Sequence, residues 1–164
     1  CHQKAALFSG SIADNIRYGN QNADEAGIEA AASTAQALDF ISELEGGFES
    51  RVAEGGSNLS GGQRQRIAIA RALARNPDLY VFDDSFSALD GRTDARLRAA
   101  LKKRTKSASV LVVSQKIETV KHADRIVVLD DGRIAGSGTH EELLLLCPLY
   151  KQLAESQNAA EVRS

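Results

Sequence analysis

Residues 59–66 read Leu-Ser-Gly-Gly-Gln-Arg-Gln-Arg, a glycine pair at the mouth of a strongly patterned helix. Ser60 can cap this helix, and Gln63 can reach back to the Ser60 amide, which makes a capping box. Gly61 and Gly62 carry no side chains, so the unpaired amides of the first helical turn lie bare at the positive end of the helix dipole. The stretch predicts an anion-binding site. An ordinary helix start after a turn would account for Ser-Gly-Gly alone.

Two further segments follow the glycine pair. Residues 78–84 read Asp-Leu-Tyr-Val-Phe-Asp-Asp, a short buried strand ending in two acids, and residues 87–90 read Ser-Ala-Leu-Asp. LSGGQ, an apolar strand ending in Asp, and SALD, in this order and spacing, resemble the nucleotide-binding domain of ATP-binding cassette (ABC) transporters. The resemblance implies an α/β fold, a partial P-loop NTPase (RecA-like) core with a mainly parallel sheet plus an α-helical subdomain. It also implies ATP and Mg²⁺ as ligands.

Composition places the 164-residue chain among ordinary globular proteins, since it is 43% hydrophobic and 26% charged. The net charge of −2 gives no overall attraction to nucleic acid, so we expect no nucleic-acid partner. Cys1 and Cys147 make no disulfide framework, which fits a reducing compartment. The longest apolar runs, such as residues 143–147, are far below the ~20 residues that span a bilayer. We therefore expect other sequence to cross any membrane that the protein serves.

The first half of the chain reads as mostly helical. Residues 11–14 can cap a short helix. Asp24 starts an Ala-rich helix, whose apolar face we expect to continue to Leu44, before two glycines at 46–47 stop it. A third helix occupies residues 61–75 and ends before Pro77, because proline disfavours helix in the residue before it.

The second half alternates strands and helices, which favours an α/β core. Residues 79–82 predict a strand buried on both faces, because parallel sheets covered on both sides give continuous apolar runs. The other expected elements are a helix capped by Asp90, strands at 110–113 and 125–129, a tight hairpin at Asp131-Gly132, a helix opened by a Thr139–Glu142 capping box, and a last helix from Pro148. The resemblance assigns residues from about 12 to 76 to the helical subdomain and about 77–164 to the C-terminal half of the α/β core.

Two segments resemble the parts of ABC exporters that face the membrane domain. Gln3, followed by Leu-Phe-Ser-Gly-Ser-Ile-Ala-Asp-Asn-Ile at 7–16, looks like the Q-loop, in which the glutamine contacts the metal and water of the nucleotide. Residues 52–58 look like the exporter X-loop, whose acidic residue here is Glu54; the family usually has Arg where Gly55 stands. The resemblance implies that coupling helices of a transmembrane domain contact the Gln3 and Glu54 regions. It places the chain at the cytoplasmic face of the cell membrane.

The resemblance also implies roles at the nucleotide. Asp83 matches the Walker B aspartate, expected to hold Mg²⁺ together with Gln3. Asp84 stands where the family has its water-polarising Glu, and Gln115 stands where it has a switch His, so these two are the expected catalytic positions. The remaining residues expected to contact nucleotide are Leu59, Ser60, Gly61, Gly62, Gln63 and Asp90.

Both catalytic positions depart from the active pattern. Asp84 is one methylene shorter than Glu, which withdraws its carboxylate from the ~2.6–3.2 Å reach that proton transfer needs. Gln115 can hold a phosphate by hydrogen bonds only, since an amide cannot carry charge. Because the LSGGQ segment is intact, we interpret the chain as the degenerate-site half of a heterodimeric exporter, paired head to tail with a second nucleotide-binding domain. The alternatives are a slow homodimeric exporter domain, an ATPase of DNA repair or chromosome organisation, and a non-enzymatic module that only dimerises.

No Gly-x-x-x-x-Gly-Lys-Ser/Thr loop occurs in the 164 residues. Without that loop the chain lacks the amide nest and the lysine that cradle phosphates. The resemblance begins at Gln3, and the chain opens on Cys1 and contains no Met. We therefore expect a C-terminal fragment of a longer ATPase, with no measurable ATPase activity of its own.

Overall fold

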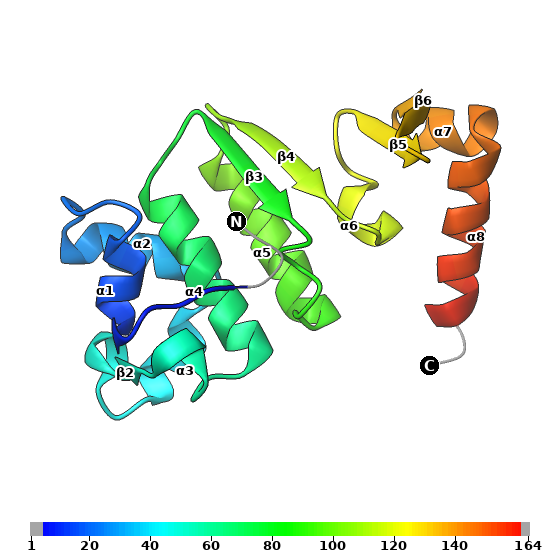
Figure 1. Cartoon of the computed structure of the whole chain (residues 1–164). Helices are drawn as coiled ribbons and strands as arrows, with labels where there is room; N and C mark the ends of the chain where they lie inside the picture. The colour runs from blue at the N-terminus through cyan, green and yellow to red at the C-terminus, as the bar shows by residue number, and fades with distance from the viewer. Residues whose placement is uncertain (1–4, 162–164) are drawn as a thin grey trace. The chain divides into compact units, whose positions relative to one another are not determined.

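The computed structural model describes residues 5–161 (Figure 1). The chain divides into two compact units, Cys1–Val113 and Ser114–Ser164. Among the residues described, no helix combines the length and apolarity that crossing a membrane requires. The predicted subdomain boundary near residue 76 lies inside the first unit and stays a prediction.

The first unit contains two strand pairs and five α-helices within its described part. Strand β1 pairs antiparallel with β2, and β3 pairs parallel with β4, with Asp83 opposite Val113 at the end of the ladder. The elements in chain order are β1 (Gly10–Ser11), α1 (Ile12–Arg17), α2 (Glu25–Thr34), α3 (Leu38–Glu43), the 3₁₀ turn η1 (Gly47–Glu49), β2 (Arg51–Val52), the 3₁₀ turn η2 (Glu54–Gly56), α4 (Gly61–Ala74), β3 (Leu79–Asp83), α5 (Gly91–Arg104) and β4 (Ser109–Val113).

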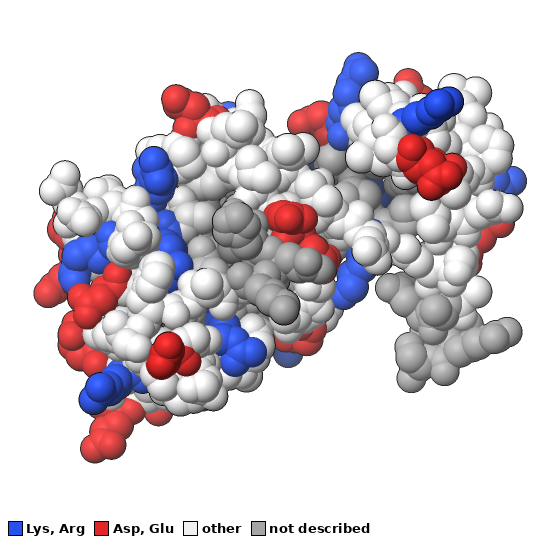
Figure 2. Space-filling model, in the orientation of Figure 1, with Lys and Arg blue, Asp and Glu red and all other residues white. Residues whose placement is uncertain are grey.

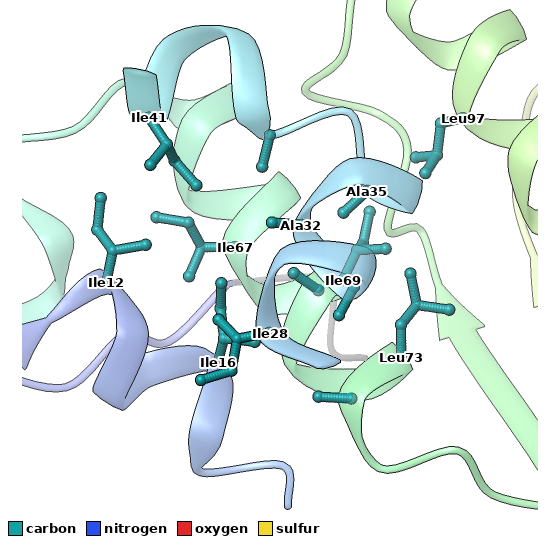
Figure 3. Close-up of a cluster of buried hydrophobic side chains, with 14 of the residues drawn as sticks. Ile12, Ile16, Ile28, Ala32, Ala35, Ile41, Ile67, Ile69, Leu73 and Leu97 are labelled. Carbon is teal, nitrogen blue, oxygen red and sulfur yellow. The ribbon is translucent and has the colours of Figure 1, made fainter. Parts of the chain in front are cut away.

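Helix α4 forms the centre of the first unit and packs against α1 and α2. Figure 3 shows its side chains Ile67, Ile69 and Leu73 surrounded by apolar side chains of the neighbouring helices. All three are fully buried. The partners drawn there are Ile12 and Ile16 of α1, Ile28 and Ala32 of α2, Ala35, Ile41 of α3 and Leu97 of α5. The helical spacing of these residues in the sequence is therefore a core pattern.

The predicted single helix from Asp24 to Leu44 is wrong, because the chain breaks it after Thr34. Gln36 adopts a left-handed φ of 57°, and its amide donates to the Ser33 carbonyl at 3.0 Å. The Ala37 amide donates to the Ala32 carbonyl at 2.8 Å, which completes a Schellman ending without the usual glycine. The break turns α3 so that Phe40 and Ile41 are buried in the same core.

The predicted burial of β3 on both faces is also wrong. Tyr80 and Phe82 belong to the core, whereas Leu79 is 53% exposed and Val81 is 41% exposed. Strand β4, which runs beside it in Figure 1, is mostly exposed as well. The alternation arises because strand side chains point to opposite faces, and only one face of this pair is covered within the described part of the chain.

In the second unit the hairpin turn and the last two helices lie at the predicted places, and the described residues form a hairpin and three helices in all. These are α6 (Ile117–Val120), β5 (Ile126–Asp130), β6 (Arg133–Gly138), α7 (His140–Leu146) and α8 (Pro148–Glu161). Asp131 and Gly132 have φ of 45° and 74°, the two positive values that a tight antiparallel hairpin prefers. The core of this unit consists of Ile126, Val128, Leu143, Cys147 and Tyr150.

Candidate functional site

The glycine pair opens the 14-residue helix α4, as predicted. Ser60 Oγ accepts a hydrogen bond from the Gln63 amide at 3.2 Å, and the Ser60 amide donates to Gln63 Oε1 at 2.8 Å. Leu59 is buried and anchors the loop in the core. Gly61 is exposed and Gly62 is half-buried, so neither is enclosed by the core. Their amides are the first two of the four that helix geometry leaves without an intrahelical acceptor.

The structure brings the predicted SALD segment against this glycine pair. A Cβ placed on Gly62 would lie 3.2 Å from the Ala88 carbonyl oxygen, which is tight contact. A Cβ on Gly61 would lie 3.9 Å from the Ala88 Cβ, which is ordinary contact. Glycine at 62 thus lets the backbone at residue 88 approach the start of α4, a proximity that the sequence spacing does not show.

Asp90 ends the SALD segment and caps α5, again as predicted. Its Oδ1 accepts a hydrogen bond from the Thr93 amide at 2.9 Å. The Thr93 side chain is the largest cause, followed by the Thr93 amide, of a lowered pKa for the Asp90 carboxyl. The carboxylate is therefore the favoured form at the start of α5, where the helix dipole also favours an anion. Contact of Asp90 with a nucleotide stays a prediction.

Asp83 and Asp84 lie at the carboxyl end of β3. Asp83 is exposed, and Asp84 is half-buried with a left-handed φ of 46°. The Asp84 amide donates to the Val113 carbonyl at 2.8 Å, and its own carbonyl accepts a hydrogen bond from Ser87 Oγ at 2.9 Å. Both backbone polar groups of Asp84 are thus held by neighbouring segments, which fixes the turn that leads out of the strand.

Gln115 belongs to the second unit and is exposed there. Its backbone carbonyl accepts a hydrogen bond from Gln157 Nε2 at 2.8 Å, while Gln157 Oε1 accepts from the Ile117 amide at 2.8 Å. The side chain of Gln157 in α8 therefore holds the backbone on both sides of Lys116 by hydrogen bonds. Gln115 belongs to the second unit, whereas Asp83 and Asp84 belong to the first. The catalytic role of Gln115 stays a prediction.

Of the two residues predicted to face the membrane domain, Gln3 and Glu54, the structure describes Glu54. Gln3 lies outside the described residues. Glu54 is exposed in η2, and Gly55 beside it has a φ of 64° with no atom within 4 Å of a built Cβ. The position is open in space but left-handed in backbone, which favours glycine over a longer side chain. This backbone gives a physical reason for Gly55 in place of Arg.

The residues present fit the expected ligands in part. Mg²⁺ is commonly held by one or two carboxylates together with substrate phosphates and water, and the exposed Asp83 at a strand end suits the single-carboxylate role. The Gly61 and Gly62 amides suit a phosphate oxygen. Within residues 5–161 no group of three His, Cys, Asp or Glu side chains is arranged to hold a metal ion. Any Mg²⁺ at Asp83 therefore needs phosphate and water as its remaining ligands.

Sequence reasoning assigned no contacts to the arginines of α4. Arg64 donates to the carbonyls of Leu59 and Gly56, so it braces the loop before the helix. Arg66 donates to the Gln36 carbonyl at 2.7 Å, and its guanidinium lies 4.6 Å from the centre of the Phe40 ring. Burial lowers the pKa of the Arg66 guanidinium, which remains protonated because its ordinary pKa is so high. The only available signal was the dense Arg spacing after the glycines.

Comparisons with known proteins agree with this geometry. The sequence profile described as ABC transporter matches residues 1–87. An uncharacterised ABC transporter ATP-binding protein of Mycobacterium tuberculosis is 48% identical over 159 residues, and the match covers 95% of this chain and 27% of the relative. An ATP-dependent lipid A-core flippase of Saccharophagus degradans is 43% identical over 156 residues, covering 95% of this chain and 27% of the flippase.

A solved structure has a similar fold. The structure of a bacterial Atm1-family ABC exporter with ATP bound matches with a TM-score of 0.90 and 37% sequence identity, over 94% of this chain and 27% of that chain. The chain thus spans 27% of the length of each of these relatives.

Proposed function

Because this chain belongs to the ABC transporter family, as part of the ATP-binding domain of an exporter, we propose that it works in a head-to-tail pair of nucleotide-binding domains. In this pair, ATP binding and hydrolysis drive transport through a transmembrane domain. Transport is the proposed function of the full-length protein, and this chain supplies part of its ATP-binding domain.

One observation carries the proposal: the Ser60–Gln63 capping box holds the first turn of α4 in shape while leaving Gly61 exposed. The amides of the glycine pair can then donate to the terminal phosphate of a nucleotide held by the opposite domain. Preorganised donors of this kind need no reorganisation as negative charge develops on the phosphate oxygens. This chain therefore contributes its intact half-site to the partner's nucleotide.

The chain's own nucleotide site is the weaker of the two in this proposal. Mg²⁺ bound at Asp83 would neutralise phosphate charge. Asp84, the residue expected to accept a proton from water, has a short side chain on a left-handed backbone that Asp adopts more readily than Glu. Gln115 cannot take over by carrying charge. These features support a degenerate site paired with an active one, in a heterodimer.

Substitution of Asp84 in the full-length assembly tests the degenerate-site proposal. We expect Asp84→Asn and Asp84→Glu to leave the rate of ATP hydrolysis unchanged, because turnover occurs at the partner's nucleotide. Gly61→Asp is the matched comparison, since a carboxylate among the phosphate-facing amides should lower the rate by at least about tenfold. A large loss with Asp84→Asn would instead indicate a homodimer that works slowly with Asp.

We further propose that the Gln3 and Glu54 regions contact coupling helices of the transmembrane domain, at the cytoplasmic face of the membrane. The exposure of Glu54 supports an accessible carboxylate on this loop. A nucleic-acid partner is not supported. The net charge is −2, and on the face drawn in Figure 2 Lys and Arg lie interspersed with Asp and Glu rather than gathered into a broad basic surface. Sequence-independent binding to nucleic acid depends on such a surface.

A further inference from the structure

Arg71, in the last turns of α4, holds the chain segment of residues 6–18 by three hydrogen bonds. Its Nη1 donates to the Ala6 carbonyl at 2.9 Å, and its Nε donates to the Asn15 carbonyl at 2.8 Å. Its Nη2 donates to Asn15 Oδ1 at 2.7 Å. A single side chain thus joins the two ends of the segment to one helix.

The same guanidinium lies against two aromatic rings. Its central carbon is 4.9 Å from the centre of the Phe8 ring and 5.7 Å from that of Tyr18. The two rings lie 4.7 Å apart, tilted by 44°. Phe8 and Tyr18 are 48% and 64% exposed, so contact with Arg71 rather than enclosure in the core orders them.

Asn15, which accepts hydrogen bonds from Arg71, is itself hydrogen-bonded to other residues of the 6–18 segment. It is 1% exposed, and its Nδ2 donates to the carbonyls of Phe8 and Ser11 at 2.9 and 3.0 Å. Its Oδ1 also accepts from the Phe8 amide at 2.9 Å. On the other side of Arg71, a Cβ at Gly19 would lie 2.0 Å from the Arg71 carbonyl oxygen. The chain from residue 6 to residue 19 therefore contacts both the side chain and the backbone of this one residue.

Geometry rather than charge explains why an arginine stands here. All three acceptors are neutral, and among residues 5–161 no salt bridge of Arg71 is found. Burial lowers the pKa of the Arg71 guanidinium without removing its proton. A planar fork with several fixed N–H groups can serve these carbonyls and stack on a ring at the same time, and a lysine cannot.

We propose that Arg71 is a positioning residue that makes α4 and the 6–18 segment move as one body. Arg71 lies ten residues after Gly61 on one continuous helix, a rise of about 15 Å. The segment that it holds begins three residues after Gln3 in the sequence. Displacement of that segment is then transmitted through Arg71 to the glycine pair. The inference rests on the proposed function, because it concerns how the glycine pair is presented to the partner's nucleotide.

The test compares Arg71→Lys, Arg71→Met and Arg75→Met in the full-length transporter. Arg75 is the matched control, an exposed arginine at the end of the same helix. Rates are measured against Mg-ATP concentration and normalised to folded dimer recovered by size exclusion. We expect both Arg71 variants to lower kcat about tenfold with KM within about twofold, since ATP is held by the opposite domain. Arg75→Met should match the unsubstituted protein.

The thermal midpoints of the same variants separate positioning from stability alone. We expect Arg71→Lys to recover part of the midpoint lost by Arg71→Met without recovering kcat. If kcat per folded dimer is unchanged in either Arg71 variant while the midpoint falls, Arg71 is only structural and the inference fails. If the unsubstituted full-length protein hydrolyses no ATP, the proposed function fails first, and the role of Arg71 with it.

Discussion

At single positions, close approach of the backbone decides which residue the chain can carry. Gly19 lies against the Arg71 carbonyl, and a Cβ on Gly56 would lie 2.8 Å from Arg64 Cδ, on a backbone with a φ of 70°. Asp84 and Asp131 also adopt left-handed backbone, which short polar side chains tolerate better than most. Local backbone geometry therefore favours glycine and aspartate at these positions, whatever their function.

Replacement of Gly19 measures the first of these contacts. Because the added Cβ would sit 2.0 Å from a carbonyl oxygen, we expect Gly19→Ala to lower the free energy of unfolding by about 1–3 kcal/mol. Gly91, with no atom within 4 Å and a place in the first turn of α5, is the control, and Gly91→Ala should gain about 0.5 kcal/mol. Urea unfolding followed by circular dichroism compares them. Equal stability of the two variants would contradict the close approach.

At the scale of elements, three helix starts in this chain follow one local rule. Ser11, Ser60 and Thr139 each close a capping box with the residue three positions later, which is Asp14, Gln63 and Glu142 in turn. The hydrogen bonds join residues close in sequence, so they form wherever the pattern occurs. The starts of α1, α4 and α7 are therefore set by local sequence.

The cap of α4 can be tested by two substitutions at one position. We expect Ser60→Ala to lower the free energy of unfolding by about 1 kcal/mol, because the Gln63 amide loses its acceptor. Ser60→Gly should cost only a few tenths of a kcal/mol, since glycine adopts the cap backbone readily. Chemical unfolding of the three proteins gives the comparison. A larger loss with glycine than with alanine would show that the capping box is not what stabilises this helix start.

The cap of α5 predicts a dependence on pH. The folded state lowers the pKa of Asp90 below its ordinary value of 3.8. The carboxylate therefore contributes stability above that value and loses it as the pH falls through the lower folded value. Asp90→Asn keeps a capping side chain that does not titrate. We expect the unsubstituted protein to lose stability relative to Asp90→Asn on acidification. A stability difference that does not change with pH would contradict this.

At the scale of the whole molecule, the two units have very different cores. The described core of the first unit gathers side chains from α1 to α5 and β3, whereas that of the second is built around a cluster of five buried side chains. One face of the β3–β4 pair stays exposed through Leu79, Val81, Leu111 and Val113. Leu145 and Leu146, at the end of α7, are 85% and 80% exposed. Each unit thus carries apolar surface that its own described elements do not cover.

The isolated 164-residue chain should bind Mg-ATP weakly at best and hydrolyse none. The sequence holds no phosphate loop, and Asp83 and the glycine pair supply only isolated contacts to phosphate and metal. Titration calorimetry with Mg-ATP measures this directly, with the full-length protein as the positive control. Tight binding by the isolated chain would show that the residues present form a nucleotide site by themselves.

The local structure at several candidate site residues could be predicted because it depends on neighbouring residues. The Leu59–Gln63 turn and the Asp90 cap each depend on neighbours within a few residues. The approach of Ala88 to Gly62 could not be predicted, since it depends on how the loop after β3 folds back onto α4. Packing decides how local motifs lie relative to one another, and the sequence of a single motif does not show it.

The sequence by itself determined where the capped helices begin, where the β5–β6 hairpin turns and which family the chain belongs to. Those features depend on hydrogen bonds and backbone preferences that span a few residues. Only the tertiary structure decided that the Ala-rich helix breaks at Gln36, that β3 is covered on one face, and that Arg66 and Arg71 serve carbonyls rather than water. The Arg66 contact spans 30 residues and those of Arg71 span 56 and 65. Such contacts depend on which surfaces meet. The arginine side chain of a helix reaches the carbonyl of a distant segment only after that segment has packed against the helix.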